Sequence, residues 1–88
     1  MIAVFDPESG SPVALLDGTE ITAIRTGACS ALSVRLVARE DSTVLPILGT
    51  GAQARSHARA VVRVRPIAEV LIAGRDRVKA DALAAELA

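Results

Sequence analysis

The fold is decided by one stretch of the sequence, Val44-Leu45-Pro46-Ile47-Leu48-Gly49-Thr50-Gly51-Ala52-Gln53-Ala54. Its first five residues form a short apolar run, typical of a buried strand, that leads directly into G-x-G-x-x-A. A helix is predicted from Ala52 to Val64, where Pro66 stops it, and a second strand from Glu69 to Ala73. Strand, glycine loop, helix and strand then form a βαβ unit, the context in which such a loop binds a dinucleotide.

The small residues of this loop have separate expected roles. Gly49 permits the tight turn that leaves the strand, and the missing side chain at Gly51 lets backbone N–H groups approach a pyrophosphate. Ala54 lets the helix lie close to the sheet. The free N–H groups and the positive dipole end of the helix then face the phosphates. The alternative is a glycine turn that binds no ligand.

The second strand should end beside the residue that contacts the adenosine ribose. Gly74 ends the strand and Arg75 follows, roughly 20 residues after the loop, where an acidic residue for the ribose 2′-OH is expected. An arginine suits a 2′-phosphate, so Arg75 favours NADP somewhat and leaves NAD open. We interpret Asp76 as the N-cap of a last helix. The apolar face of that helix comprises Ala80, Leu83, Ala84 and Leu87.

Pro46 conflicts with this interpretation. The first strand of such a unit is normally central, and a proline there forfeits a hydrogen bond of the ladder. We expect either a local bulge or a weaker sheet.

The residues before the loop predict a hairpin and a long helix. Two apolar runs joined by a Pro/Gly/Ser connection predict a hairpin over residues 1–17. Helical spacing follows over residues 20–39, with Asp17 or Thr19 available as the N-cap. The predicted fold is therefore α/β, a partial Rossmann-type βαβ unit preceded by a β-hairpin and a long connecting helix.

Two faces of the predicted connecting helix differ in character. The apolar residues that share one face are Ile21, Ile24, Ala28, Ala31 and Leu32. The hydroxyl residues on the other face are Thr22, Thr26, Ser30 and Ser33, with Ala23 and Gly27 beside them. A glycine inside a helix costs about 1 kcal/mol relative to Ala, so Gly27 indicates close approach by another group. That group is either a tightly packed helix or a polar ligand that the hydroxyl face borders.

Length and composition exclude several classes of protein. Eighty-eight residues allow one small domain. Ten basic residues balance ten acidic ones, which argues against a nucleic-acid partner bound by bulk positive charge. No run reaches the ~20 apolar residues of a membrane span, and the single cysteine forms no intrachain disulfide. We expect a cytoplasmic protein without nucleic-acid or membrane partners.

Other chemistry-bearing side chains are assigned ordinary roles. With one histidine and one cysteine, no metal site is expected. His57 is assigned a packing or hydrogen-bonding role, and Cys29 is interpreted as buried filler rather than a nucleophile. The stripe of Arg55, Arg59 and Arg63 is interpreted as a solvated helix face.

Two segments resemble the ornithine cyclodeaminase/mu-crystallin family. They are Asp17–Ala31, DGTEITAIRTGACSA, and Ile47–Arg55, ILGTGAQAR, in the family's order and spacing. The similarity extends from the first strand to about Leu87. Members of this family are NAD(P)-dependent oxidoreductases that act on amino acids or cyclic imines, including ornithine cyclodeaminases, ketimine reductases and some alanine dehydrogenases.

The resemblance implies functional residues by position. Arg25 resembles the family arginine that lies at the cofactor and the substrate carboxylate, and Thr26 belongs to the hydroxyl face on the nicotinamide side. The implied cofactor-binding residues are Arg25, Thr26, Gly49, Gly51, Ala52, Gln53 and Arg75. No residue matches the family's acidic catalytic residue or its upstream substrate-binding lysine and arginine, so no catalytic residue is assigned.

The resemblance also implies a division of the chain. Residues 1–40 correspond to the end of the substrate and dimerisation domain, and residues 43–88 to the N-terminal part of the Rossmann NAD(P)-binding domain. We expect a fragment of an oxidoreductase or deaminase that is inactive alone, and its status as an enzyme stays open. The alternative is a non-catalytic nucleotide-binding or oligomerisation module. Homodimerisation also stays open.

Overall fold

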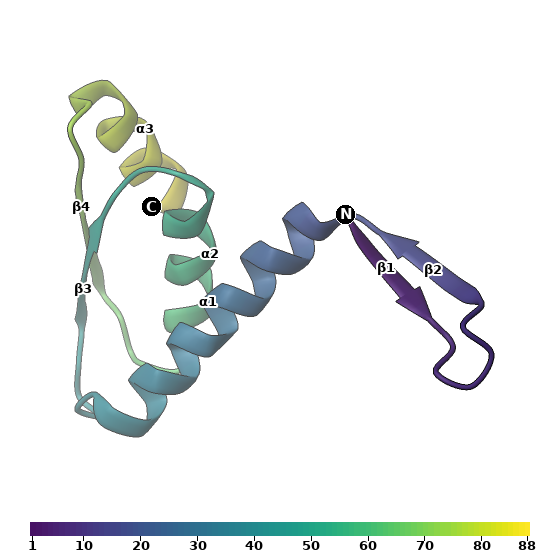
Figure 1. Ribbon diagram of the computed structural model, residues 1–88. Helices are drawn as coiled ribbons and strands as arrows, with labels where there is room; N and C mark the ends of the chain where they lie inside the picture. Colours follow the sequence, from purple (N-terminus) through teal and green to yellow (C-terminus); the bar gives the residue numbers. More distant parts are fainter.

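The computed structural model describes residues 1–88 as a β-hairpin followed by one long helix and an α/β unit (Figure 1). The elements are β1 (Ile2–Phe5), β2 (Pro12–Leu16), α1 (Gly18–Val37), β3 (Val44–Leu48), α2 (Ala52–Val61), β4 (Glu69–Ala73) and α3 (Arg77–Leu87). This arrangement confirms the predicted α/β fold and the order of its parts. None of the three helices combines the length and hydropathy that a membrane crossing requires.

The hairpin stands away from the rest of the chain (Figure 1). Its strands pair antiparallel, with a register irregularity between Val4 and Phe5. At the turn the Asp6 carboxylate accepts the N–H of Glu8 at 2.8 Å and that of Ser9 at 3.5 Å. These backbone hydrogen bonds hold the pKa of Asp6 below its usual value. Each strand pairs along one edge only, and all side chains of the two strands except the half-buried Ile2 are exposed.

Helix α1 begins and ends two residues earlier than the predicted 20–39. Asp17 is its N-cap, and its Oδ1 accepts the N–H of Thr19 at 2.9 Å. Because Asp17 is the N-cap, the helix begins at Gly18, before Ile21, the first apolar residue of the predicted face. At the other end the backbone becomes extended at Ala38.

The packed face of α1 is its small-residue face. Gly27 and Ala31 are buried against α2, whereas Ile24 is 67% exposed and Leu32 55% exposed. A Cβ added at Gly27 would lie 2.8 Å from the carbonyl oxygen of Ser56, so no larger residue fits that crossing. The group that approaches Gly27 is therefore α2, the first of the two alternatives. The apolar stripe found by spacing lies mostly outside this contact.

The βαβ unit forms as the sequence predicts. Strands β3 and β4 pair in parallel without a register shift, from Val44 opposite Glu69 to Leu48 opposite Ala73. Helix α2 ends at Val61 rather than Val64, because the next residues form tighter turns, in which Val64 N–H bonds the carbonyl of Val61 at 3.0 Å. The core of the unit consists of Ile47, Ala54, Ala58 and Leu83.

Asp76 is the N-cap of α3. Its Oδ1 accepts the N–H of Val78 at 3.0 Å and that of Lys79 at 3.3 Å. This confirms the capping interpretation. In α3 itself Ala80 and Leu83 are buried, whereas Ala84 is exposed.

Pro46 causes no bulge, so the first of the two expected effects is wrong. Toward β4, the carbonyl of Thr43 accepts the N–H of Ala68, and the N–H of Gly49 bonds the carbonyl of Ala73. Odd-numbered positions of β3 therefore direct their backbone groups to β4, since these groups alternate along a strand. Pro46 is an even position, so its missing N–H belongs to the open edge and the β3–β4 ladder is complete.

Candidate functional site

The glycine loop joins the end of β3 to the start of α2, as predicted. Gly49 has a φ of +121°, a conformation that L side chains rarely adopt. Its N–H donates to the carbonyl of Ala73 at 2.7 Å, which fixes the loop against the end of β4. Gly49 is therefore required by the turn itself.

Gly51 has no such internal reason to be glycine. Its φ of −87° is ordinary for any residue. A Cβ built at Gly51 meets no atom of the chain within 4 Å. Neither backbone strain nor packing explains the residue, so the space that a side chain would take is open to a group from outside the chain.

The start of α2 is favourable for an anion. Gly51 is its N-cap and supplies no side-chain hydrogen bond, and the first turn contains no acidic residue. The first-turn N–H groups of a helix have no partner within the helix, and the helix dipole is positive at this end. Ala52 and Gln53 are exposed there. These donors fit the pyrophosphate of a dinucleotide.

A cavity of about 440 Å³ lies beside these donors. Its lining residues are Met1, Ile2, Gly18, Thr19, Thr22, Ala23, Ala52 and Gln53. The start of α1, with the hydroxyls of Thr19 and Thr22, thus borders the same space as the start of α2. Sequence reasoning did not assign Thr19 to the site and gave Thr22 no individual role, because their signal is only a hydroxyl-rich helix face.

Arg25 and Thr26 lie on α1 but outside this cavity. Arg25 is exposed and Thr26 is half-buried. Neither side chain forms a hydrogen bond or an ion pair within the chain. The guanidinium of Arg25 therefore stays available to an anionic ligand.

Arg75 lies at the same edge of the sheet as the glycine loop, directly after β4. It is exposed, and its guanidinium makes no hydrogen bond or ion pair within the chain. The two loops touch, because a Cβ added at Gly74 would lie 2.9 Å from Cγ2 of Thr50. The structure therefore brings Arg75 and the loop residues Gly49, Gly51, Ala52 and Gln53 to one edge.

Two of the ordinary assignments need correction. Arg55 and Arg59 are not simply solvated, because Nε of Arg55 lies 2.9 Å from a carboxylate oxygen of Glu86 and Nη2 of Arg59 lies 3.6 Å from the other. They link α2 to α3. Cys29 is exposed rather than buried filler, since α1 turns its opposite face to α2. The hydrogen-bonding role of His57 is confirmed by Nδ1, 2.6 Å from the carbonyl of Gln53.

Arg65 was missed altogether by sequence reasoning. Its Nη2 donates to the carbonyls of Val34 at 3.2 Å and of Arg35 and Ala38 at 2.9 Å. Its Nε donates to the carbonyl of Arg39 at 2.9 Å. One guanidinium thus caps the end of α1, where the carbonyls of Arg35 and Ala38 have no backbone partner. This cap holds α1 and α2 in a fixed relation.

This chain is similar to known proteins in both sequence and structure. The model of the ornithine cyclodeaminase/mu-crystallin family matches residues 1–88. An L-lysine cyclodeaminase of Streptomyces rapamycinicus is 49% identical over 71 residues, which cover 81% of this chain and 21% of that protein. The chain spans about a quarter of the length of the curated relatives it matches.

Two solved structures superpose on nearly the whole chain. One is Thermococcus litoralis Δ1-pyrroline-2-carboxylate reductase in complex with NADH and L-proline, with a TM-score of 0.93, 41% identity, and coverage of 97% of this chain and 26% of that one. The other is an archaeal alanine dehydrogenase dimer with bound NAD, with a TM-score of 0.87, 33% identity, and coverage of 93% and 26%.

Proposed function

The chain belongs to the ornithine cyclodeaminase/mu-crystallin family, and on this premise we propose that it provides the phosphate-binding start of an NAD(P)-dependent oxidoreductase or deaminase. The proposed substrate class is an amino acid or a cyclic imine, because the relatives include an L-lysine cyclodeaminase and a Δ1-pyrroline-2-carboxylate reductase. Residues 43–88 would form the first part of the nucleotide-binding domain. Residues 1–40 would form the edge of the substrate domain.

The observation that carries this proposal is the glycine at position 51. Packing and backbone conformation both permit a side chain there, and the N–H groups of Ala52 and Gln53 lie next to the open space. A pyrophosphate seated on these N–H groups would need the room that a Cβ fills. When bound, a nicotinamide supplies hydride transfer at the substrate's α-carbon.

Arg25 would hold the negative charge of the substrate carboxylate or the cofactor. Its permanent charge and planar fork suit an oxygen anion. Thr26 would contribute its hydroxyl on the nicotinamide side. The chain has no residue matched to the family's catalytic acid, so binding without turnover is the activity we propose for these 88 residues.

The test is a titration with NADPH followed by the emission of the reduced nicotinamide, since the chain has neither Trp nor Tyr. We expect saturable binding by the unaltered chain. Gly51→Ala should raise the Kd about tenfold or more, which is about 1.4 kcal/mol or more of binding free energy. Gly51→Asp should abolish binding, because it adds a negative charge at the phosphate position.

A matched control separates binding from folding. Ala68→Asp adds the same charge at the opposite edge of the sheet, where residue 68 is exposed before β4. This variant should bind NADPH as the unaltered chain does. Equal affinity of Gly51→Ala and the unaltered chain, with both folded by circular dichroism, would contradict the proposed phosphate site.

The finer proposal is a preference for NADP carried by Arg75. Its free guanidinium at the carboxyl end of β4 suits a 2′-phosphate on the ribose. Arg75→Ala should weaken NADPH binding about tenfold or more, because charge-assisted hydrogen bonds contribute about 1.5–3 kcal/mol. NADH binding should change little. An equal loss for both nucleotides would contradict a 2′-phosphate contact.

A further inference from the structure

The guanidinium of Arg65 joins α1 and α2 at their carboxyl ends. Its Nη1 donates to the carbonyl of Val64, just after α2, at 2.7 Å. Its Nη2 and Nε donate at 2.9–3.2 Å to four carbonyls at the end of α1 and just after it, those of Val34, Arg35, Ala38 and Arg39. We call this guanidinium with its five carbonyl partners the Arg65 clamp. A planar fork with donors in several directions fits such a set, whereas a lysine ammonium presents a single point.

The backbone that carries the clamp is fixed to α2. The N–H of Arg65 donates to the carbonyl of Val61, the last residue of α2, at 3.2 Å. The N–H of Ile67 donates to the carbonyl of Arg65 at 2.9 Å. Pro66, the next residue, further restricts the backbone of Arg65. The clamp therefore follows α2 and imposes its position on the end of α1.

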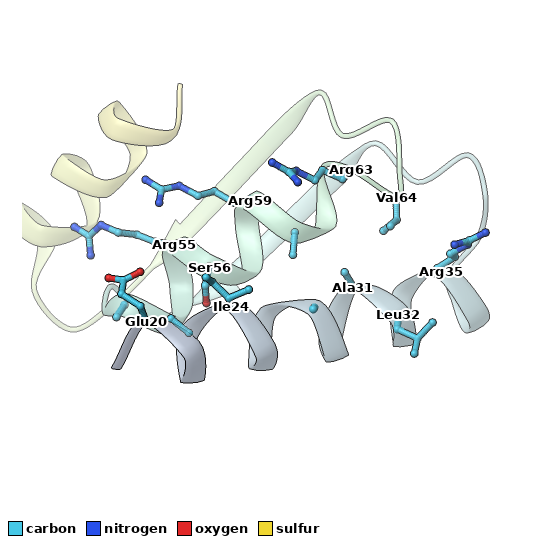
Figure 2. A pocket seen from close by; sticks show the side chains of 14 residues that line it. Glu20, Ile24, Ala31, Leu32, Arg35, Arg55, Ser56, Arg59, Arg63 and Val64 are labelled. Carbon is cyan, nitrogen blue, oxygen red and sulfur yellow. The ribbon is translucent and has the colours of Figure 1, made fainter. Parts of the chain in front are cut away.

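The rest of the contact between the two helices resists motion only weakly. The residues of α1 buried against α2 are Gly27 and Ala31. Packed helices resist tilting when the side chains of one form ridges that fill the grooves of the other, and Gly and Ala form low ridges. One side of the contact is open, as a groove of about 630 Å³ between α1 and α2 (Figure 2). Packing alone therefore leaves the angle between the helices poorly fixed.

The clamp and the candidate site lie at opposite ends of the same two helices. Figure 2 shows Glu20 at one end of the groove and Arg35 and Val64 at the other, at the end that the clamp holds. The cavity beside the candidate phosphate donors, with Thr22 and Gln53 in its lining, lies at the starting end of both helices. Any effect of the clamp on that cavity therefore passes along α1.

The crossing at Gly27 divides α1 into two arms of similar length. Val34, which the clamp bonds, lies seven residues after Gly27, and Thr22 lies five residues before it. These separations are about 10 Å and 8 Å along a helix. A tilt about the crossing that moves one arm by about 1 Å therefore moves the other arm by a similar distance, whereas a binding site must be held within about 0.5 Å.

We propose that Arg65 is a positioning residue: its clamp fixes the angle of α1, so that the start of α1 stays beside the start of α2. The clamp thereby sets how far Thr22 lies from the free N–H groups of Ala52 and Gln53, across the cavity that these residues line. Arg65 does not line that cavity itself. The consequence for NADPH rests on the proposed dinucleotide site, whereas the geometry does not.

Distances between spin labels test the geometry. In a Cys29→Ser background, Glu20→Cys at the start of α1 and Val78→Cys at the start of α3 supply two exposed label positions. Pulsed electron paramagnetic resonance should give one narrow distance distribution when Arg65 is present. Water that replaces the guanidinium lets the clamped ends part by about 3 Å, a hydrogen-bond length. Arg65→Met should therefore widen or shift the distribution by about 2 Å or more, since the two arms are similar in length.

Two further variants make the result decisive. Arg39→Met removes an arginine side chain from the same corner and leaves the clamp intact, because the clamp uses only the backbone carbonyl of Arg39. Its distance distribution should match that of the unaltered chain. Arg65→Lys keeps the charge but loses the fork, so it should stay folded more readily than Arg65→Met and change the distribution in the same direction. An unchanged distribution in either folded Arg65 variant would overturn the proposal.

Titration with NADPH tests the consequence for binding. With the folded fraction measured by circular dichroism, Arg65→Lys should raise the Kd of the folded chain about tenfold, because a misplacement of about 1 Å disrupts a bound geometry. Arg39→Met should leave this Kd unchanged. A role of Arg65 in stability alone would lower the folded fraction without changing the Kd, and that result would contradict a positioning role. If the unaltered chain binds no NADPH, the proposed function fails, and the label distances still decide the role of Arg65.

Discussion

Gly27 lies in the middle of α1 and Gly51 at the start of α2, and in both places the sequence has a glycine where a helix does not require one. The space around the two residues differs completely. At Gly27 an added Cβ would lie 2.8 Å from the backbone oxygen of Ser56, and at Gly51 it would meet nothing within 4 Å. The α1–α2 crossing is closed by the chain itself, whereas the loop before α2 is open. A glycine that the chain's own atoms explain is structural, and Gly51, which they leave unexplained, is where we propose that a ligand binds.

The largest expected effect separates these two glycines directly. Gly27→Val should lower the free energy of unfolding by about 3 kcal/mol or more, because a backbone carbonyl cannot yield to the new side chain as a flexible side chain can. Gly51→Val should lower it by no more than about 1 kcal/mol, the cost of a poorer N-cap residue, since the site is open and its φ suits valine. Denaturant unfolding followed by helical circular dichroism measures both. Similar losses at the two positions would break the comparison.

Arg65 provides a second test of the α1–α2 crossing, because its side chain bonds carbonyls at the end of α1. Arg65→Met removes the guanidinium that bonds four carbonyls at the end of α1 and just after it, and we expect a loss of about 2–3 kcal/mol in the free energy of unfolding. Arg39→Met is the matched control, because the Arg39 side chain is 84% exposed and forms only a long ion pair with Asp41. That variant should unfold nearly as the unaltered chain does. An Arg65 variant as stable as its control would show that water replaces the cap without loss.

The smallest expected effect is confined to the hairpin, outside both glycine regions. The pKa of Asp6 is lowered from its usual 3.8 by the N–H groups of Glu8 and Ser9. The turn is therefore fully stabilised above that usual value and loses this contribution as the pH falls through the lowered one. The protection of the Glu8 and Ser9 amides against hydrogen exchange, measured relative to the intrinsic rate at each pH, should fall in acid. In Asp6→Asn the acid dependence should disappear while the turn persists, and an unchanged acid response there would assign it to another group.

The order and type of the elements could be predicted because their signals are local. Asp17 and Asp76 cap helices through hydrogen bonds to residues two positions away, and the G-x-G-x-x-A loop specifies its own turn. The same locality explains why Gly49 could be assigned to the turn before any coordinates were known. For Pro46 the structure was needed, because the sequence does not say whether the backbone groups of even-numbered or of odd-numbered residues of β3 face β4.

The parts that could not be predicted depend on distant residues. Apolar spacing selects Ile24 and Leu32 of α1, but the helix packs on α2 through Gly27 and Ala31, since only small residues permit that close crossing. The exposure of Cys29 follows from the same rotation of α1. Likewise nothing near Arg65 in the sequence marks it as a cap. Candidate-site residues were found where a motif names them, and Thr19 was not, because its place beside Gln53 exists only in three dimensions.

The two ends of α1 are completed at different times as the chain emerges from the ribosome. Its first turn needs only Asp17, which is made before the helix itself. Its last turn waits for Arg65, whose contact with Arg39 spans 26 positions of chain. Until Arg65 has been synthesised, the carbonyls of Arg35 and Ala38 have only water as a hydrogen-bond partner. The last turn of α1 is therefore completed only when the segment containing α2 and Arg65 has packed against the helix.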